Sequence, residues 1–283
     1  MAEWRDYNGS DTGGHGHAIV GGSLHVLHRL PSPQLGGERD ILAYLPASYA
    51  TGERRYPVIY MHDGQNLFDP DTSFSGAWGV DHALHALGDC DMEAMEAIVI
   101  AIPNGGARRL DEYSPFSDSH HGGGDGDAYL RYITDTIKPI VDADFRTLPD
   151  RESTGLLGAS MGGLISLFGF FERPEVFGFA GVMSPSLWFA EGEIFSYIEA
   201  SPRVPGRLVV DVGTGESPIM VHYARRLRDT LLAKGYAQGH DLCYREIEGA
   251  GHNEAAWGAR LRENLRFLLP RLVAQRPQAF AAD

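Results

Sequence analysis

The chain has 283 residues, of which 43% are hydrophobic, and a formal net charge of −14 at pH 7 from 24 basic and 38 acidic residues. This length is sufficient for one large domain with a full hydrophobic core. The negative charge disfavours nucleic acid and anionic membranes as partners, because both repel acidic proteins. No stretch has the length and apolarity of a membrane span, and the N-terminus lacks the basic start and apolar run of a secretory signal. We therefore expect a cytoplasmic protein that binds neither nucleic acid nor a membrane.

Residues 1–22 are rich in glycine and histidine. We expect a flexible N-terminal segment here rather than a metal site, since His15 and His17 have no further ligands at a fixed spacing. No linker or composition shift divides the remainder, so residues 23–283 are expected to form a single domain. Cys90 and Cys243 lie far apart in the sequence and are interpreted as unpaired thiols. The sequence predicts neither a metal nor a cofactor.

From residue 23 onward, short apolar segments alternate with amphipathic ones. Two alternating segments, 24–30 and 39–46, predict an antiparallel pair of strands at a sheet edge. Further strands are predicted at 58–61, 97–102, directly before 158, and at 179–183, 208–212 and 242–247. Helices are predicted at about 80–87, 128–141, 161–173, 193–198, 219–234 and 255–272, with a long glycine-rich stretch at 104–126. This order predicts an α/β fold with a mostly parallel central sheet and helices on both faces, whose ligands bind beyond the carboxyl ends of the strands.

Residues 158–162 read Gly-Ala-Ser-Met-Gly, which is the G-x-S-x-G pattern of a nucleophile elbow placed between an apolar strand and an apolar helix. A serine hydroxyl that stands above a sheet requires a strained turn, and Gly158 and Gly162 remove the side chains that would clash there. Ser160 is the predicted nucleophile. The N–H of Met161, at the helix start, is predicted to stabilise negative charge that forms beside Ser160. The competing interpretation is a glycine-rich corner in an inert core.

A serine nucleophile needs a base, and the base needs a carboxylate that holds its tautomer. His222 lies within a predicted helix, and His240 precedes a strand on the wrong side of the sheet. His252 follows the last strand in a loop with two glycines, so it is the predicted base.

The carboxylate is expected after the strand at 208–212. Glu216 follows a Gly-Thr-Gly turn and can reach back over the sheet edge, whereas Asp211 is still within the strand. We favour Glu216, with Asp211 as the alternative. The second oxyanion donor is predicted to be the N–H of Gln65, in the turn at 62–66, where Asp63 is expected to structure the turn through its carboxylate.

Three residues are weaker candidates for substrate binding. Trp188 and Leu187 follow the strand at 179–183 and either form a wall of the substrate pocket or pack in the core. Arg109 lies in the glycine-rich stretch, where it either clamps an anionic substrate or belongs to an ion-pair network that orders the loop.

Together these motifs resemble the putative esterase (esterase D-like) family of α/β-hydrolases, and most of all its siderophore-esterase-like and feruloyl or acetyl-xylan esterase-like members. The segments that carry the resemblance are 44–46, 62–69, 158–163, 184–188, 213–216 and 251–252. The resemblance implies an α/β-hydrolase fold and a triad of Ser160, Glu216 and His252, and it places the oxyanion donor after Asp63-Gly64 at Gln65. Many members of the family have aspartate where this chain has Glu216.

The resulting hypothesis is a serine carboxylesterase that forms an acyl-enzyme on Ser160. Its expected substrate is a short-acyl, feruloyl-type or siderophore-type ester of a small molecule or oligosaccharide. The alternative is an acyltransferase that uses the same triad to move the acyl group to an acceptor other than water. A non-catalytic binding protein on this fold is the third reading.

Overall fold

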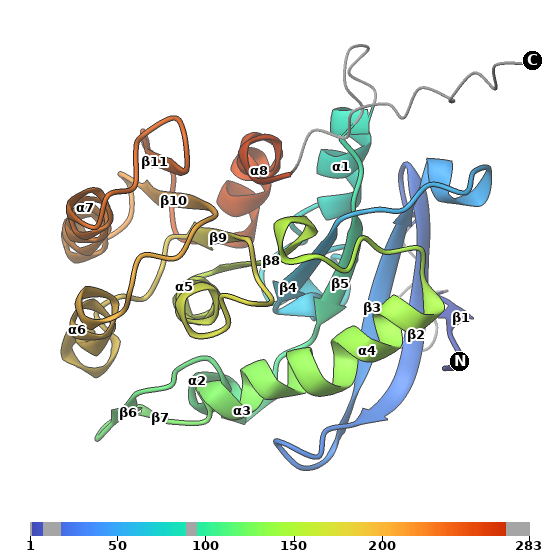
Figure 1. The fold of residues 1–283 in the computed structure, drawn as a ribbon, viewed down its shortest axis with the longest axis horizontal. Coiled ribbons are helices and arrows are strands. Elements are labelled where there is room, and N and C mark those ends of the chain that lie inside the picture. The colour runs from blue at the N-terminus through green and yellow to red at the C-terminus, as the bar shows by residue number, and fades with distance from the viewer. Residues whose placement is uncertain (1, 8–17, 89–94, 270–283) are drawn as a thin grey trace, which may run out of the picture.

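The computed structural model describes residues 2–7, 18–88 and 95–269 (Figure 1). Their main feature is a nine-stranded sheet with the order β1-β2-β3-β5-β4-β8-β9-β10-β11. The strands are β1 (Arg5–Asp6), β2 (Gly22–Pro31), β3 (Glu38–Pro46), β4 (Val58–His62), β5 (Ile98–Ile102), β8 (Thr154–Ala159), β9 (Phe179–Met183), β10 (Arg207–Gly213) and β11 (Leu242–Ile247). The pairs β1–β2, β2–β3 and β3–β5 are antiparallel, and the remaining pairs are parallel.

Helices cover both faces of the sheet (Figure 1). They are α1 (Val80–Gly88), α2 (Arg109–Glu112), α3 (Gly126–Arg131), α4 (Lys138–Asp144), α5 (Met161–Glu172), α6 (Glu193–Ala200), α7 (Pro218–Ala233) and α8 (Glu254–Leu268). Short 3-10 helices occur at Ala47–Ala50, Gly64–Asn66, Gly106–Arg108, Arg151–Ser153 and Phe189–Gly192. The predicted fold class, with its parallel sheet and antiparallel N-terminal strands, is confirmed.

The central strands are apolar throughout because each contributes to two cores. Along β4, Val58 and Tyr60 point into the core beneath α4 and α5, whereas Ile59 and Met61 point into the core beneath α1 and α8. Successive side chains of a strand alternate between its faces, so only an unbroken apolar run fills both cores.

The stretch at 104–126 contains more structure than its glycines predict. It includes α2 and a small hairpin of β6 (Ser117–Asp118) with β7 (Gly122–Gly123). The single helix expected at 128–141 is instead α3, a π-helical segment (Tyr132–Ile137) and α4. The final helix ends at Leu268, earlier than predicted.

The N-terminal residues that the structure describes contact the domain. Arg5 and Asp6 pair with β2, and the ring of Trp4 lies 4.9 Å from that of Phe145. His15, His17 and Cys90 lie outside the described residues, whereas Cys243 is a free thiol.

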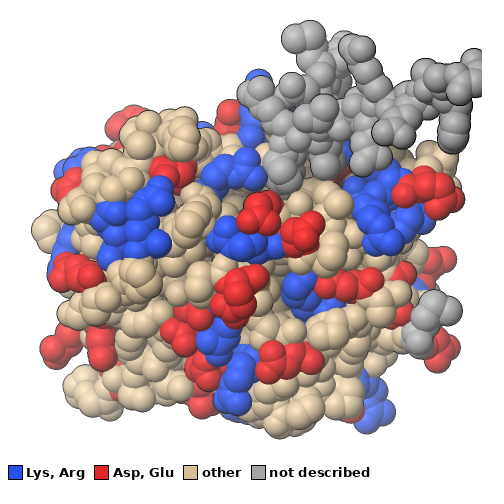
Figure 2. All heavy atoms as spheres, viewed as in Figure 1, with Lys and Arg blue, Asp and Glu red and all other residues tan. Residues whose placement is uncertain are grey.

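Two further features concern the apolarity of the helices and the charge of the surface. Within the described ranges, none of the helices has the length and apolarity needed to cross a membrane. Figure 2 shows acidic and basic side chains interspersed across the face that it displays.

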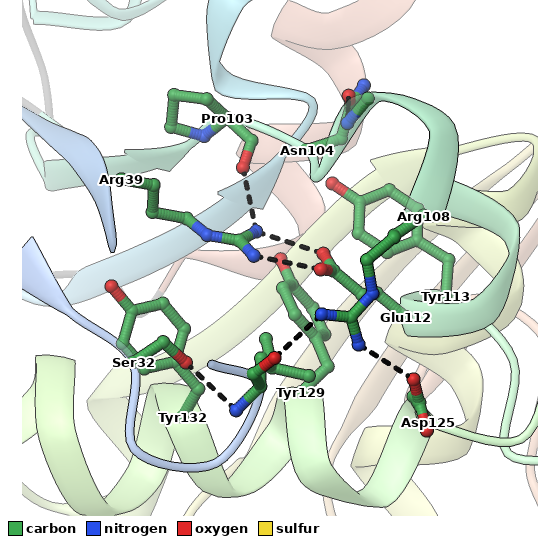
Figure 3. Close-up of polar contacts among 12 residues, drawn as sticks. Ser32, Arg39, Pro103, Asn104, Arg108, Glu112, Tyr113, Asp125, Tyr129 and Tyr132 are labelled. Carbon is green, nitrogen blue, oxygen red and sulfur yellow. Dashed lines mark hydrogen bonds and ion pairs between the residues drawn. The ribbon is translucent and has the colours of Figure 1, made fainter. Parts of the chain in front are cut away.

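A buried ion pair fastens α2 to the sheet (Figure 3). Arg39 on β3 donates two hydrogen bonds of 2.9 Å to the carboxylate of Glu112 and a third, of 3.1 Å, to the carbonyl of Pro103. Glu112 is 1% exposed. Arg108 joins the carbonyl of Leu35 to the carboxylate of Asp125, and its bond to Asp125 can be followed in Figure 3.

We expect Glu112→Ala to lower the free energy of unfolding by roughly 3–5 kcal/mol, because it leaves the guanidinium of Arg39 buried without its anion. Urea unfolding followed by circular dichroism measures this loss. The exposed pair of Arg29 with Glu38 provides the control, since Glu38→Ala should change stability far less. Equal losses in the two variants would contradict a structural role for the buried pair.

Candidate active site

Ser160 occupies a strained turn between β8 and α5. Its backbone angles are φ 59° and ψ −121°, which a residue with a side chain rarely adopts. The turn closes because Gly158 lacks a side chain: a Cβ there would lie 2.7 Å from the carbonyl carbon of Gly162. The N–H of Ser160 donates to the carbonyl of Met183 at 3.0 Å, which ties the turn to β9. This is the geometry of a nucleophile elbow.

The structure brings His252 to Glu216. Nδ1 of His252 lies 2.8 Å from Oε2 of Glu216, and the side chain of Glu216 is completely buried. Since a carboxylate accepts a hydrogen bond, Nδ1 carries the proton and Nε2 keeps its lone pair for use as a base. The edge of the His252 ring also packs against Trp257, with the ring centroids 5.0 Å apart.

Glu216 is ionised despite its burial. Burial disfavours the charged form, but hydrogen bonds from His252, from the hydroxyl of Ser184 and from the N–H of Gly213 outweigh it and hold the pKa of Glu216 below its usual value. Both oxygens of the carboxylate are therefore occupied by donors, which fixes its orientation towards His252.

Asp211, the alternative carboxylate, has other partners. It is fully buried within β10, where Arg260 donates to one of its oxygens at 2.9 Å and Asn264 donates to the other at 2.6 Å. Burial raises the pKa of Asp211, and these two donors oppose the rise. The geometry thus favours Glu216 over Asp211 as the partner of His252.

The hydroxyl of Ser160 has an unexpected neighbour. Its Oγ is hydrogen-bonded to Oγ of Ser186 at 3.0 Å. The N–H of Ser186 also donates to the carbonyl of Ser160 at 3.0 Å. Ser186 has no role in the predicted site, although it lies in the segment 184–188 that carries the family resemblance. Among the described residues, no hydrogen bond joins Ser160 to His252; hydrogen bonds between catalytic groups are often long or poorly aligned before substrate binds.

Two backbone N–H groups are available for an oxyanion. Met161 begins α5, so its N–H has no acceptor within the helix. Gln65 lies in the 3-10 helix Gly64–Asn66, beyond the end of β4. Thr72 donates to the carbonyl of Gln65 at 2.7 Å, and the side chain of Gln65 accepts the N–H of Asn104 at 3.2 Å. Because β4 and β8 are adjacent and parallel, both N–H groups lie at the same edge of the sheet.

Asp63 has a left-handed backbone (φ 55°, ψ 46°) and holds in place the turn that contains Gln65. Arg109 donates to both of its carboxylate oxygens, at 2.7 and 2.8 Å, and Asn104 donates a third hydrogen bond at 2.6 Å. The N–H of Asp63 donates to the hydroxyl of Tyr113 at 2.9 Å. Of the two roles considered for Arg109, the structure displays the ion pair that orders the loop.

The other predicted substrate contacts differ in exposure. Trp188 is 37% exposed, and its ring lies 5.6 Å from that of His121 on the β6–β7 hairpin. Leu187, by contrast, is fully buried in the core, which is the second of the two roles predicted for it.

A buried histidine lies beneath the elbow. Cδ2 of His62 would be 2.8 Å from a Cβ on Gly158, and Nδ1 of His62 lies 2.8 Å from the hydroxyl of Tyr129. Nε2 of His62 has no hydrogen-bond partner among the described residues. Burial lowers the pKa of His62 to about 3, which keeps the ring neutral under the nucleophile.

Among the described residues, no group of three histidine, cysteine, aspartate or glutamate side chains is arranged to hold a metal ion.

Known proteins are similar to this chain in sequence and in fold. A family model described as "Putative esterase" matches residues 32–268. YbbA of Bacillus subtilis, an uncharacterized protein, is 28% identical over 238 residues, which span 78% of this chain and 89% of YbbA. A siderophore triacetylfusarinine C esterase of Aspergillus fumigatus is 34% identical over 148 residues, about half of each chain (49% and 47%). The crystal structure of the BES protein of Bacillus cereus has the same fold, with a TM-score of 0.69 at 22% identity over 86% of this chain and 93% of that one.

We expect Asp63→Asn to slow covalent labelling of Ser160 by a fluorophosphonate about a hundredfold, because weaker pairing with Arg109 releases the turn that carries Gln65. Labelling rates followed by intact-protein mass spectrometry measure this effect. Asp125→Asn, which alters the exposed pair with Arg108 nearby, should label at the wild-type rate. Unchanged labelling in Asp63→Asn would separate this turn from the reactivity of Ser160.

His62 makes stability sensitive to acid. Its ring is neutral in the folded protein down to about pH 3 but protonates near pH 6.5 when unfolded, so stability is lost as the pH falls from 6.5 towards 3. The loss from this residue approaches roughly 1.4 kcal/mol per pH unit. We expect a shallower fall in His62→Gln, measured by urea unfolding between pH 7 and 4. The control is His222→Gln, which changes an exposed histidine and should keep the wild-type dependence of unfolding free energy on pH. If His62→Gln also kept the wild-type dependence, His62 would not be the source of the acid sensitivity.

Proposed function

The chain belongs to the "Putative esterase" family, and we propose that it is a serine carboxylesterase that works through an acyl-enzyme on Ser160. Membership of the family makes it a carboxylic ester hydrolase. One observation above all supports this mechanism. His252 is hydrogen-bonded to the buried carboxylate of Glu216, and the same domain presents Ser160 on a strained turn.

In the first half of the reaction, Ser160 Oγ attacks the carbonyl carbon of the ester, and Nε2 of His252 takes the hydroxyl proton. Glu216 stabilises the imidazolium that forms. The N–H groups of Met161 and Gln65 donate to the oxyanion of the tetrahedral intermediate. Collapse of this intermediate breaks the ester bond, and His252 returns the proton to the departing alcohol.

In the second half, water attacks the acyl-enzyme. His252 takes a proton from that water, the same two N–H groups stabilise the second oxyanion, and Ser160 leaves with the proton from His252. The acid is released and the resting enzyme is restored.

The substrate that we propose is a short-acyl, feruloyl-type or siderophore-type ester. The relative named for a siderophore ester supports the last of these. The rings of Trp188 and His121, which form a half-exposed aromatic pair after β9 and on the β6–β7 hairpin, suit an aryl or other flat apolar group.

The test is hydrolysis of p-nitrophenyl esters of increasing acyl length by wild type and Ser160→Ala. We expect Ser160→Ala to lower kcat by several orders of magnitude, because the nucleophile cannot be replaced by its neighbours. Activity that peaks at acetyl or butyryl would identify a short-acyl esterase. Labelling of wild type by a fluorophosphonate without turnover would direct the search to siderophore and feruloyl esters.

Ser201→Ala is the matched control, since Ser201 follows α6 at the opposite edge of the sheet and should leave the rate unchanged. Product analysis in the presence of competing alcohols or sugars separates hydrolysis from acyl transfer. Ester turnover that survives in Ser160→Ala would refute the proposal.

A further inference from the structure

Behind Glu216 lies a buried polar network that the reaction above does not use. Its members come from three elements: Ser184 directly after β9, Asp211 on β10, and Arg260 with Trp257 and Asn264 on α8. Asp211, Ser184 and Asn264 are fully buried, and Arg260 is 5% exposed. An interior position is costly for an arginine, so its contacts require an explanation.

Arg260 lies between two carboxylates. Its Nε donates to Asp211 at 2.9 Å, and one of its terminal nitrogens lies 3.7 Å from Oε1 of Glu216. The same terminal nitrogen donates to the hydroxyl of Ser184 at 2.6 Å. Ser184 in turn donates to Oε1 of Glu216, the oxygen that does not face His252.

Ser184 is itself held firmly. Its backbone has a positive φ of 40°, and its N–H donates to the carbonyl of Asp211 at 2.7 Å. Its hydroxyl also accepts the indole N–H of Trp257 at 3.1 Å. With two donors directed at its oxygen, the hydroxyl proton has one remaining direction, which is towards Glu216.

We propose that Arg260, fixed by Asp211 and acting through Ser184, is a positioning residue for the carboxylate of Glu216. It sets both the orientation of that carboxylate and the net charge behind His252. This inference rests on the proposed function, because it assigns Glu216 to the triad.

A purely structural ion pair would predict something different. If Arg260 served only to satisfy Asp211, its removal would reduce stability and would reduce activity only in proportion to the fraction unfolded. The distinguishing feature of the network is its charge, since Asp211 and Arg260 carry opposite signs and lie on the same side of Glu216. Their removal should therefore act on His252 in opposite directions.

The charged and titratable groups around this site must be considered together. They are Glu216 after β10, Asp211 on β10, Arg260 and the buried Glu254 on α8, and Arg245 on β11, which hydrogen bonds to Asn264 and acts electrostatically on Asp211. Glu216, Glu254 and Arg245 are kept in all variants of the experiment.

The experiment measures kcat, KM and the pH profile of kcat/KM for Arg260→Met, Asp211→Asn and the double variant, with a p-nitrophenyl ester that wild type hydrolyses through Ser160. In Arg260→Met we expect kcat to fall about tenfold to a hundredfold with little change in KM. The acid limb of its profile should move to higher pH, by roughly 1 unit, because loss of a positive charge favours protonated His252.

Asp211→Asn should move the acid limb to lower pH, since it leaves the charge of Arg260 less compensated. The double variant removes both charges and should return the limb towards its wild-type position. Arg266→Met, an exposed residue of the same helix, is the control for α8. If Arg260→Met does not fold, Ser184→Ala provides the second test, with a fall in kcat at unchanged KM.

Shifts of the acid limb that have opposite signs in the two single variants and cancel in the double variant would support the proposal. Destabilisation of the fold would instead affect both single variants in the same direction. The proposal would be overturned if the acid limb stayed in place in all variants. It would also be overturned if the limb moved in the same direction in Arg260→Met and Asp211→Asn, in parallel with their loss of thermal stability. A wild-type enzyme without Ser160-dependent turnover would instead refute the proposed function, so the two failures are distinguishable.

Discussion

The site depends on a backbone conformation that an ordinary residue avoids. Ser160 has φ 59°, and strain of this kind costs about 1–3 kcal/mol. It persists because Gly158 lets β8 and α5 approach where a Cβ would collide with the backbone of Gly162, and because the N–H of Ser160 donates to the carbonyl of Met183 on β9. The apolar strands on both sides of β8, buried on both faces, supply the stability that offsets this strain.

The same positive-φ conformation occurs at the ends of the neighbouring strands. Asp63 follows β4 and Ser184 follows β9, and both have a positive φ although neither is glycine. Each is held through its own N–H, Asp63 by the hydroxyl of Tyr113 and Ser184 by the carbonyl of Asp211. Three adjacent strands, β4, β8 and β9, are thus followed by strained residues at their carboxyl ends. Here the chain changes from adding a strand on one side of β4, which is β5, to adding one on the other side, which is β8. Ligand sites of parallel sheets lie at such an edge.

The sequence predicts the repeated patterns of this protein better than its single contacts. Runs such as 58–61 and 97–102 identify strands because burial on both faces favours apolar residues at every position, and the elbow is identified by its G-x-S-x-G pattern, in which Gly158 has no room for a Cβ. The hairpin at 117–123 was missed because its two-residue strands are too short for any periodicity. The contacts of Arg260 were also missed, since they depend on α8 lying against β10. A signal existed: an aspartate within the buried strand at 208–212 requires a cation, and Trp257, Arg260 and Asn264 fall on one face of the last helix.

Charge explains why two carboxylates occupy this region when the proposed triad needs one. Asp211 and Glu216 together carry two negative charges, and Arg260 between them cancels one. The remaining negative charge lies on Glu216, whose second oxygen faces Nδ1 of His252. In the mechanism that we propose, His252 takes a proton from Ser160 and the group as a whole becomes neutral, so the positive charge would form where its counter-ion is already fixed and no solvent would have to reorganise. Glu216 without Arg260 would face Asp211 as a like charge, which would favour protonation of one of them. The buried arginine thus allows a carboxylate that supports the fold and a carboxylate that serves His252 to lie behind the same histidine.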